Sequence, residues 1–532
     1  MNTIKEMIQA SAKKYPNNIA FYEKVGKEYI GITYKKLYED LINLGNALLS
    51  ENLKNKYIGV IGKNSYEWAL AYLVTVCGLG RVVPLDKQMT KSEIENCIDQ
   101  LEIDTIIYSK EEDKKMNKEK YNTICMQTEL NDLIEKGKNI DNNYENITIN
   151  SKDPAVFLLT SGTTGNSKIV MLSNENIVFN VESTSQFLNI NENDKLFSIL
   201  PMHHTMESSF GFLTPLYYGA SIIHVDSLKN IQKDMLRTKP SVIIGVPRII
   251  DMFDEKITKE IEKKGKTKLI KTAKYITNAV PALRKPIFKD VHNSFGGNLQ
   301  KILVGGAPAN PEVLKRLREY GFTVLQGYGL TECAPLVTAN KKNNFKDSAV
   351  GLPLEDTEIL INNPNEEGIG EVIVKGKNVM LGYYNNEEAN NKVLKDGYFY
   401  TGDLGSIDKD GFLYIKGRDK NVIISSNGKN VYPEEIEIIV EKSENIKQAV
   451  VSAGVDSKGN DIVKVEIVLV DELLKKFNNN EKFKEEITKV INDFIKEVNQ
   501  QISEYKRIKQ VILKNEPFEL TTTQKIKRYA CK

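Results

Sequence analysis

The sequence predicts an α/β protein whose first and larger part is built from doubly wound sheets. Short β-rich runs alternate with helical patterns over residues 57–108, and the same alternation recurs over residues 195–246 and 299–324. Strands that alternate with helices form parallel sheets with helical crossovers. The length of 532 residues is too great for one domain, so we expect further folding units after these repeats.

The first alternating region can be assigned element by element. YIGVIG reads as a buried strand, and Ser65 is a plausible N-cap for the helix that follows. Gly78 and Gly80 should end that helix. VVPLD is the next strand, KSEIENCIDQL a helix and TIIYS a further strand. Residues 110–150 are polar, and we expect a loop-rich connection there.

The later regions differ in character. Residues 258–289 are lysine-rich with apolar residues at helical spacing, which favours a solvated amphipathic helix pair over a membrane-facing patch. Residues 351–417 are rich in β-formers with glycine turns, and residues 418–532 read as an α+β cap. We therefore expect an N-terminal domain over residues 1–417, with α/β subdomains over 1–350 and a β-rich subdomain over 351–417, and a C-terminal domain over 418–532.

Composition narrows the functional class. Apolar residues make up 41% and charged residues 27%, as in ordinary globular proteins. A net charge of +2 argues against a nucleic-acid partner. The five cysteines are scattered without a Cys-x-x-Cys pair, which predicts reduced thiols. The N-terminal residues lack a long apolar core, so we expect a cytoplasmic protein with at most peripheral membrane contact.

A glycine- and hydroxyl-rich loop is the most informative motif. LLTSGTTGNSKIVMLS reads as a strand, a polar loop and a second strand. Glycines let backbone N–H groups approach a ligand, hydroxyls add donors and lysine adds a point charge, which together suit a polyphosphate. The register excludes a Walker A loop, because Ser167 and Ile169 stand where that pattern needs Gly and Ser or Thr. The candidate phosphate-binding residues are Thr160, Ser161, Gly162, Thr163, Thr164, Gly165 and Lys168.

Two strand–turn segments follow about twenty residues apart. ILVGGAPA supplies Gly306, Ala307 and Pro308, and VLQGYGLTECAP supplies Gln326, Gly327, Tyr328, Gly329, Thr331 and Glu332. An aromatic face can stack on adenine, a hydroxyl can bond phosphate and a carboxylate can hold Mg²⁺. These segments are therefore candidates for nucleotide and metal binding.

Three further segments complete the candidate site. PMHHTME, with His204, follows a strand, where open α/β sheets bind ligands. YTGDLG places Asp403 in a glycine-flanked turn, and Arg418 follows in GRDKNVIISSNGKNVYP. LTTTQKIKR offers Lys525 in a polar segment near the C-terminus.

These motifs, in this order, resemble the adenylate-forming (AMP-binding) superfamily, and their wording is closest to its long-chain fatty acid–CoA ligases. The resemblance implies that Tyr328 stacks on adenine, Glu332 holds Mg²⁺, and Asp403 and Arg418 grip the ribose. It implies a mobile C-terminal domain that swings about Lys420, a mobile catalytic Lys525, and a thiol tunnel at Gly428. It also implies that His204 faces the carboxylate substrate, with Ser208, Phe210 and Gly211 at the acyl pocket.

The implied reaction converts a medium-to-long-chain fatty acid to acyl-AMP with release of pyrophosphate, and then transfers the acyl group to the thiol of coenzyme A. ATP, Mg²⁺ and CoA are the implied cofactors. An acyl carrier protein remains an alternative acceptor, because the basic excess of residues 501–532 suits either CoA phosphates or an acidic protein. Another carboxylic-acid adenylating enzyme of the same superfamily, including one that stops at the adenylate, is a further alternative. A non-catalytic acyl or nucleotide sensor is a rival that should lack Glu332, Arg418 or Lys525, and all three are present.

Overall fold

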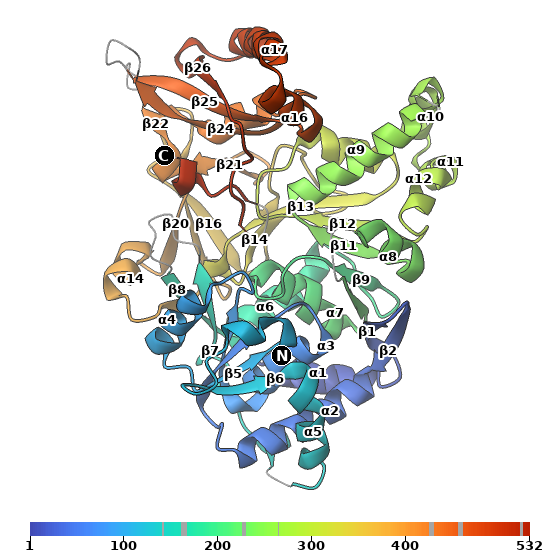
Figure 1. Cartoon of the computed structure of the whole chain (residues 1–532), viewed down its shortest axis with the longest axis vertical. Coiled ribbons are helices and arrows are strands. Elements are labelled where there is room, and N and C mark those ends of the chain that lie inside the picture. Colours follow the sequence, from blue (N-terminus) through green and yellow to red (C-terminus); the bar gives the residue numbers. More distant parts are fainter. Residues whose placement is uncertain are drawn as a thin grey trace. The chain divides into compact units, whose positions relative to one another are not determined.

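The computed structural model describes residues 1–140, 143–160, 168–225, 230–263, 265, 267–424, 430–455, 461–521 and 525–531. The chain divides into two compact units. Unit 1 contains Met1–Glu358 and Val374–Phe399, and unit 2 contains Ile359–Ile373 and Tyr400–Lys532. The predicted α/β class, with a large N-terminal and a small C-terminal part, is confirmed (Figure 1). The boundary between residues 417 and 418 remains a prediction.

The first sheet of unit 1 has seven strands in the order β18-β8-β7-β4-β3-β5-β6. Strands β7, β4, β3, β5 and β6 run parallel, and the β8 and β18 edge is antiparallel, so the sheet combines helical crossovers with one hairpin. Its strands are β3 (Lys56–Ile61), β4 (Gly80–Leu85), β5 (Thr105–Tyr108), β6 (Asn122–Cys125), β7 (Pro154–Thr160), β8 (Lys168–Ser173) and β18 (Gly382–Tyr383). The helices between them are α3 (Tyr66–Val74), α4 (Lys91–Leu101) and α5 (Met126–Gly137).

The region expected to be a loop-rich connection is partly regular, so that expectation is wrong. Residues 110–150 contain β6 and the whole of α5. β6 is short and its first residue is exposed, which hides the strand pattern, yet it pairs in register with β5. In α5 the buried residues Met126, Leu130 and Ile134 recur every four positions, as expected for one helical face.

The second sheet of unit 1 has nine strands in the order β15-β14-β13-β12-β11-β9-β10-β1-β2. Strands β13, β12, β11, β9, β10 and β1 are parallel to their neighbours, while β14, β15 and β2 pair antiparallel. They are β1 (Ile19–Val25), β2 (Glu28–Thr33), β9 (Lys195–Ser198), β10 (Ser221–His224), β11 (Val242–Gly245), β12 (Lys301–Val304), β13 (Thr323–Gly329), β14 (Leu336–Ala339) and β15 (Leu352–Pro353).

Further helices of unit 1 are α2 (Tyr34–Ser50), α6 (Asn174–Ser183), α7 (Thr214–Tyr218), α8 (Ile231–Thr238), α9 (Pro247–Lys263), α10 (Thr267–Ala279), α11 (Arg284–Ile287), α12 (Lys289–Ser294) and α13 (Pro311–Glu319). One large apolar core joins residues of β9, β11, β12 and β13 to residues of α8, α9, α10, α12 and α13. The predicted helix pair in residues 258–289 is therefore helical, although it begins earlier, within α9.

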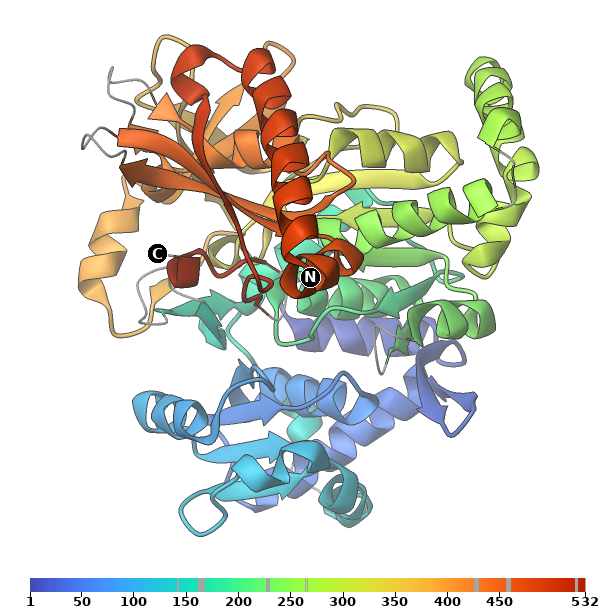
Figure 2. The same cartoon turned by 45° about the horizontal axis from the view of Figure 1, so that its top comes forward.

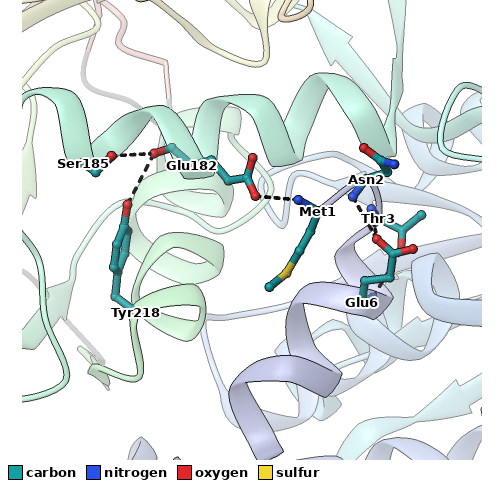
Figure 3. Close-up of polar contacts among 7 residues, drawn as sticks. All are labelled: Met1, Asn2, Thr3, Glu6, Glu182, Ser185 and Tyr218. Atoms are coloured by element: carbon teal, nitrogen blue, oxygen red, sulfur yellow. Dashed lines mark hydrogen bonds and ion pairs between the residues drawn. The ribbon is translucent and has the colours of Figure 1, made fainter. Parts of the chain in front are cut away.

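The first helix, α1 (Ile4–Lys14), is anchored to α6 (Figure 3). A capping box begins α1, because Thr3 Oγ1 accepts from Glu6 N while Glu6 Oε2 accepts from the backbone of Asn2 and Thr3. The Met1 ammonium lies 2.8 Å from Glu182 Oε1 of α6. This contact matters because α6 also positions part of the candidate site.

Unit 2 has its own core, formed mainly by a three-stranded sheet and the helices that pack on it. β24 (Ile446–Val455) pairs antiparallel with β25 (Asp461–Leu469), and β25 pairs parallel with β26 (Ile508–Leu513). The helices are α15 (Pro433–Val440), α16 (Asp471–Asn479) and α17 (Glu481–Gln501). The short strands β22 (Ile423–Ile424) and β23 (Asn430–Val431) form a separate pair.

The division into units falls within β16 (Thr357–Asn362), β17 (Gly370–Gly376) and β20 (Tyr398–Ile407). Inside unit 2, β20 pairs antiparallel with β21 (Leu413–Arg418). All five cysteines are free thiols, as the sequence predicts. In the described part of the chain, no helix is both long and apolar enough to cross a membrane.

Candidate functional site

The predicted phosphate loop closes a β-hairpin. β7 and β8 are paired so that Thr160 stands opposite Lys168, and Thr160 Oγ1 donates to the Lys168 carbonyl at 3.2 Å. The strand–loop–strand pattern therefore holds at both ends of the loop. Five predicted phosphate-binding residues lie outside the described residues: Ser161, Gly162, Thr163, Thr164 and Gly165.

The other predicted segments of unit 1 share one edge of the nine-stranded sheet. β9, β11, β12 and β13 run parallel, so the residues after each strand lie at the same edge. Gly305, after β12, donates its N–H to the Gly245 carbonyl at the end of β11. Met206, from the histidine segment after β9, approaches within 3.3 Å of the position of a Cβ on Gly305.

The GGAP turn is shaped by its second glycine. Gly306 has a φ of +83°, a left-handed conformation that glycine adopts without strain. Ala307 is half-buried and Pro308 is exposed. Asn310 then caps α13 by accepting from Glu312 N. The turn therefore presents its backbone at the sheet edge, held at its far end by a helix.

The second segment, at the end of β13, combines close backbone packing with one orphaned polar atom. A Cβ on Gly329 would lie 2.0 Å from the carbonyl oxygen of Pro335, so only glycine fits there, and a Cβ on Gly327 would lie 3.0 Å from the Thr338 carbonyl oxygen. Tyr328, between them, is half-buried. Gln326 is 6% exposed, and its Oε1 has no hydrogen-bond partner among the described residues. A buried amide oxygen of this kind calls for a donor from a ligand or water.

Buried asparagine fixes the turn that carries Thr331 and Glu332. Asn180 of α6 donates to the Cys333 carbonyl at 3.0 Å and accepts from the Leu336 N–H at 2.8 Å. Asn180 is fully buried, so these bonds form away from water. α6 thus holds both sides of the turn with one side chain.

Two more buried side chains hold the same turn. Ser209 Oγ donates to the Ala334 carbonyl at 3.1 Å, and Asn378 Nδ2 donates to the Leu336 carbonyl at 2.8 Å. Met380 N donates to the Glu332 carbonyl at 2.8 Å. The Glu332 backbone, in the turn after β13, is therefore fixed by a segment about 50 residues downstream.

Tyr383 connects the phosphate loop with the carboxylate predicted to hold metal. Its hydroxyl donates to Glu332 Oε1 at 2.9 Å, and Lys168 Nζ lies 4.3 Å from the centre of its ring. β18, which carries Tyr383, pairs with β8 just beyond Lys168. Tyr383 is 4% exposed, so its position is tightly determined. The arrangement brings a cation, an aromatic ring and a carboxylate together at the end of the hairpin.

The histidine segment is held to the first sheet by Asn64. Asn64 Nδ2 donates to Ser198 Oγ at 3.1 Å and to the Leu200 carbonyl at 2.7 Å, and its Oδ1 accepts from Met202 N. His204 follows, with its ring centre 4.5 Å from that of His203. The two sheets are therefore joined just before the residue expected to face the carboxylate substrate.

A π-helix, η5 (Glu207–Leu213), contains all three predicted acyl-pocket residues. Ser208, Phe210 and Gly211 are buried, and Phe210 packs edge-to-face on Phe187 at 6.2 Å. A Cβ on Gly211 would lie 2.3 Å from Glu207 Oε1, so this glycine leaves room for the carboxyl group. π-helices of one turn are frequent at functional sites.

Glu207 is a buried carboxyl that sequence reasoning did not single out. Its side chain is fully buried, and this burial raises its pKa to about 8, although the Ser198 hydroxyl and the Leu200 backbone act to lower it. Glu207 is therefore largely protonated near neutral pH. A neutral carboxyl beside the histidine segment can donate as well as accept a hydrogen bond.

In unit 2, the structure brings two predicted residues together. Asp403 of β20 and Arg418 of β21 are register partners, and Arg418 Nε lies 2.9 Å from Asp403 Oδ1. Lys420 follows in a 3₁₀ turn, η9 (Asp419–Asn421), and is exposed. Asn421 donates to Glu434 Oε1 of α15 at 2.8 Å. Gly428 lies outside the described residues.

Lys525 is exposed and lies in a small hairpin. Leu520 and Ile526 form a β-bridge, and Thr521 N donates to the Lys525 carbonyl at 2.8 Å. Three residues later, Arg528 contacts Glu437 of α15 through a short ion pair. Burial raises the pKa of Glu437 to about 7, and Arg528 acts in the opposite direction. Arg528 thus ties the Lys525 hairpin to the helix that also holds Asn421.

Several residues of this site carry no local sequence signal. Tyr383, Asn180 and Asn378 act on Glu332 or its turn from 42 to 156 residues away. A single asparagine or tyrosine in an ordinary strand or helix has no pattern that reveals such a partner. For Tyr383, the sequence offers only the short GYYN segment, in which two tyrosines follow a glycine.

Both parts of the sequence match known protein families. Residues 8–384 match the family described as AMP-binding enzyme, and residues 420–532 match the AMP-binding enzyme C-terminal domain. The long-chain-fatty-acid–CoA ligase ACSBG2 of Mus musculus is 27% identical over 490 residues, which cover 83% of this chain and 73% of that protein.

Two solved structures share the fold. An anthranilate CoA ligase, AuaEII, in complex with anthranoyl-AMP has a TM-score of 0.81 and 17% identity, covering 99% of this chain and 96% of its own. The o-succinylbenzoate coenzyme A synthetase of Bacillus subtilis, in complex with ATP and magnesium ion, has a TM-score of 0.75 and 22% identity, covering 98% of each chain. Because the first family match spans most of the sequence, the chain belongs to the AMP-binding enzyme family.

Proposed function

We propose that the protein is an AMP-forming acid–thiol ligase that activates a medium-to-long-chain fatty acid with ATP and transfers the acyl group to coenzyme A. The observation that carries this proposal is the link from Lys168 through Tyr383 to Glu332, at the end of the glycine- and hydroxyl-rich hairpin. A polyphosphate site needs a cation and a metal-binding carboxylate that are held at fixed positions near each other. Tyr383 contacts both Lys168 and Glu332 and can hold them in this way. Membership in the AMP-binding enzyme family supports an adenine nucleotide as the ligand of this site.

In the first half-reaction the substrate carboxylate attacks the α-phosphorus of ATP, and pyrophosphate leaves. The protein contributes positioning and charge stabilisation. We assign Thr160 and Lys168, with the loop between them, to the β- and γ-phosphates. Tyr328 offers its ring to the adenine, and the orphaned Gln326 Oε1 can accept from the adenine amino group. His204 faces the carboxylate of the acid.

The residues present fit a magnesium ion. Among the described residues, no group of three or more His, Cys, Asp or Glu side chains could enclose a metal. Mg²⁺ is usually bound through one or two carboxylates together with substrate phosphates and water, and Glu332 supplies one such carboxylate. Bound there, Mg²⁺ would neutralise charge on the phosphates. Tyr383 orients the Glu332 carboxylate for this role.

Unit 2 carries the residues we assign to the rest of the cycle. Asp403 and Arg418, already paired at 2.9 Å, would hold the ribose. Lys525 would neutralise charge between the carboxylate and the α-phosphate during adenylation. A rotation about Lys420 would then withdraw Lys525 and admit the CoA thiol past Gly428. The thiol attacks the acyl carbon, and AMP leaves.

The acid is proposed to be a fatty acid for two reasons. A relative aligned over 83% of the chain is named a long-chain-fatty-acid–CoA ligase. In addition, Ser208, Phe210 and Gly211 lie on the buried η5 helix, where each methylene of a substrate buried against Phe210 would contribute about 0.8 kcal/mol. We propose a cytoplasmic location for the enzyme.

Acid-dependent pyrophosphate release tests the proposal directly. The purified chain should release pyrophosphate with fatty acids, most efficiently with medium-to-long chains, and should form a thioester when CoA is added. Holo-acyl carrier protein is compared with CoA as acceptor. Release with an aryl acid above every fatty acid would overturn the substrate, whereas binding of ATP and acid without turnover would favour a sensor.

A matched pair of variants tests the carrying observation. Tyr383→Phe keeps the ring beside Lys168 and removes only the hydroxyl that bonds Glu332. Since a hydrogen bond to a charged group contributes about 1.5–3 kcal/mol, we expect pyrophosphate release to fall about 10- to 100-fold. Tyr38→Phe removes a comparable tyrosine–carboxylate bond, to Glu145 at 2.8 Å, and should leave the rate unchanged. Equal rates in both variants would remove Tyr383 from the mechanism.

A further inference from the structure

The helical segment around α10 combines two features that rarely occur together on a soluble surface. Between Lys263 and Lys289 the sequence has nine lysines and arginines and no aspartate or glutamate; Glu262 and Asp290 bound this stretch. The same stretch exposes large apolar side chains. They are Leu269 (64% exposed), Tyr275 (84%), Ile276 (46%), Val280 (47%), Leu283 (40%) and Ile287 (41%).

Packing of the opposite face explains why these side chains stay exposed. Ala273 and Thr277 of α10 are buried, and Ile270 packs against the main core of unit 1. Lys274 pairs with Glu319 of α13 at 2.8 Å. Because this face is already docked, Leu269, Tyr275 and Ile276 cannot turn inward. α10 lies at the outer margin of unit 1 in both views (Figures 1 and 2).

We propose that the surface formed by these six exposed apolar side chains together with Lys285 and Lys289 docks unit 1 on an anionic lipid bilayer. An amphipathic helix binds a bilayer interface when apolar side chains enter the acyl boundary and lysines face anionic headgroups. Lys285 and Lys289 are exposed and can reach such headgroups. The apolar side chains distinguish this surface from one that binds a soluble polyanion, which would need only the charge.

Charge also argues against a second copy of the chain as the occupant. A two-fold symmetric contact places the same patch on both partners, so the exposed Lys285 and Lys289 of one copy would face the same positive charges of the other. The long surface helix α17 provides a contrast. Lysines and acidic residues are interspersed along α17. In the described part of the chain, Val490 is the one large apolar side chain that this helix exposes.

Vesicle co-sedimentation of the full chain, without substrates, tests the proposal independently of the ligase activity. Vesicles of phosphatidylcholine alone are compared with vesicles that also contain phosphatidylglycerol. We expect binding to the anionic vesicles only, with weaker binding as salt is added. Each surface lysine contributes about fivefold to such partitioning, so Lys285→Glu with Lys289→Glu should weaken it more than about 25-fold.

The second variant removes apolar area and leaves the charge unchanged. Tyr275→Ser with Ile276→Ser alters only exposed side chains, so the fold should survive, as circular dichroism can check. Binding should fall several-fold, while Val490→Ser and Lys482→Glu with Lys489→Glu on α17 should bind as the parent protein does.

Four outcomes would overturn the proposal. Equal binding to neutral and anionic vesicles, or none to either, excludes an anionic bilayer. If vesicle binding is lost in the Lys285→Glu, Lys289→Glu variant but kept in the Tyr275→Ser, Ile276→Ser variant, the surface binds a soluble polyanion instead. Self-association in sedimentation velocity that the Ser variant abolishes points to a second copy of the chain.

Discussion

Glu207 shows how a single buried group couples the site to pH. Its carboxyl has a pKa of about 8 in the folded chain, because burial disfavours the charged form, against about 4.3 for an exposed glutamate. The folded state therefore binds more protons than the unfolded state between these values. The contribution of Glu207 to stability is fullest below about pH 4.3 and is lost as pH rises through about 8.

Glu207→Gln should remove this pH dependence. The amide has nearly the size of the protonated acid and cannot ionise, so the slope of unfolding free energy against pH, up to about 1.4 kcal/mol per pH unit, should flatten. Urea unfolding of both proteins, measured between about pH 4.3 and pH 8, checks this expectation. Glu485→Gln, at an exposed position of α17, should keep the parent slope. If the Glu207→Gln variant also retained the parent slope, another group would have to be the one that titrates.

At the scale of elements, α6 acts as a support for the site. Asn176 holds the carbonyls of Lys377 and Val379, and Asn180 holds both sides of the Glu332 turn. The ion pair between Met1 and Glu182 attaches α1 to the same helix (Figure 3). One ten-residue helix therefore fixes parts of the chain that are far apart in sequence.

Asn180→Ala should damage both stability and activity. It removes the hydrogen bonds that Asn180 makes to a buried carbonyl and a buried N–H, which should cost about 2–4 kcal/mol of unfolding free energy. Pyrophosphate release should fall as well, because Glu332 loses its support. Asn298→Ala, which removes an exposed bond to Lys239, serves as the control in urea unfolding. A loss of stability without any loss of rate would separate α6 from the catalytic turn.

The elements that sequence alone predicts are those with local patterns. The β7–β8 hairpin, the helix capped by Ser65 and the strands that end at Val304 and Gly329 follow from apolar runs and glycines. β6 does not follow, because it is an edge strand of four residues with polar positions. Tyr383 and Asn180 do not follow either, because their roles depend on partners that only the tertiary fold brings near.

For the whole molecule, the proposed two-step cycle makes opposite predictions for two residues of unit 2. Lys525→Ala should nearly abolish adenylation, because a charge present only in the first transition state is lost, yet thioester formation from supplied acyl-AMP should continue. Lys420→Pro should block backbone rotation, so adenylation should continue while thioester formation is lost. The two half-reactions are measured separately. Equal damage to both steps in either variant would count against rotation about Lys420.

The strand order of unit 1 also constrains how the chain can fold as it is synthesised. β1 pairs with β10, about 200 residues later, and β8 pairs with β18, which begins at Gly382. Neither sheet can be completed until most of unit 1 has left the ribosome. Such long-range pairing gives a high contact order, slow folding and a long period with open strand edges. We therefore expect this chain to depend on chaperones during synthesis more than a protein with locally paired strands.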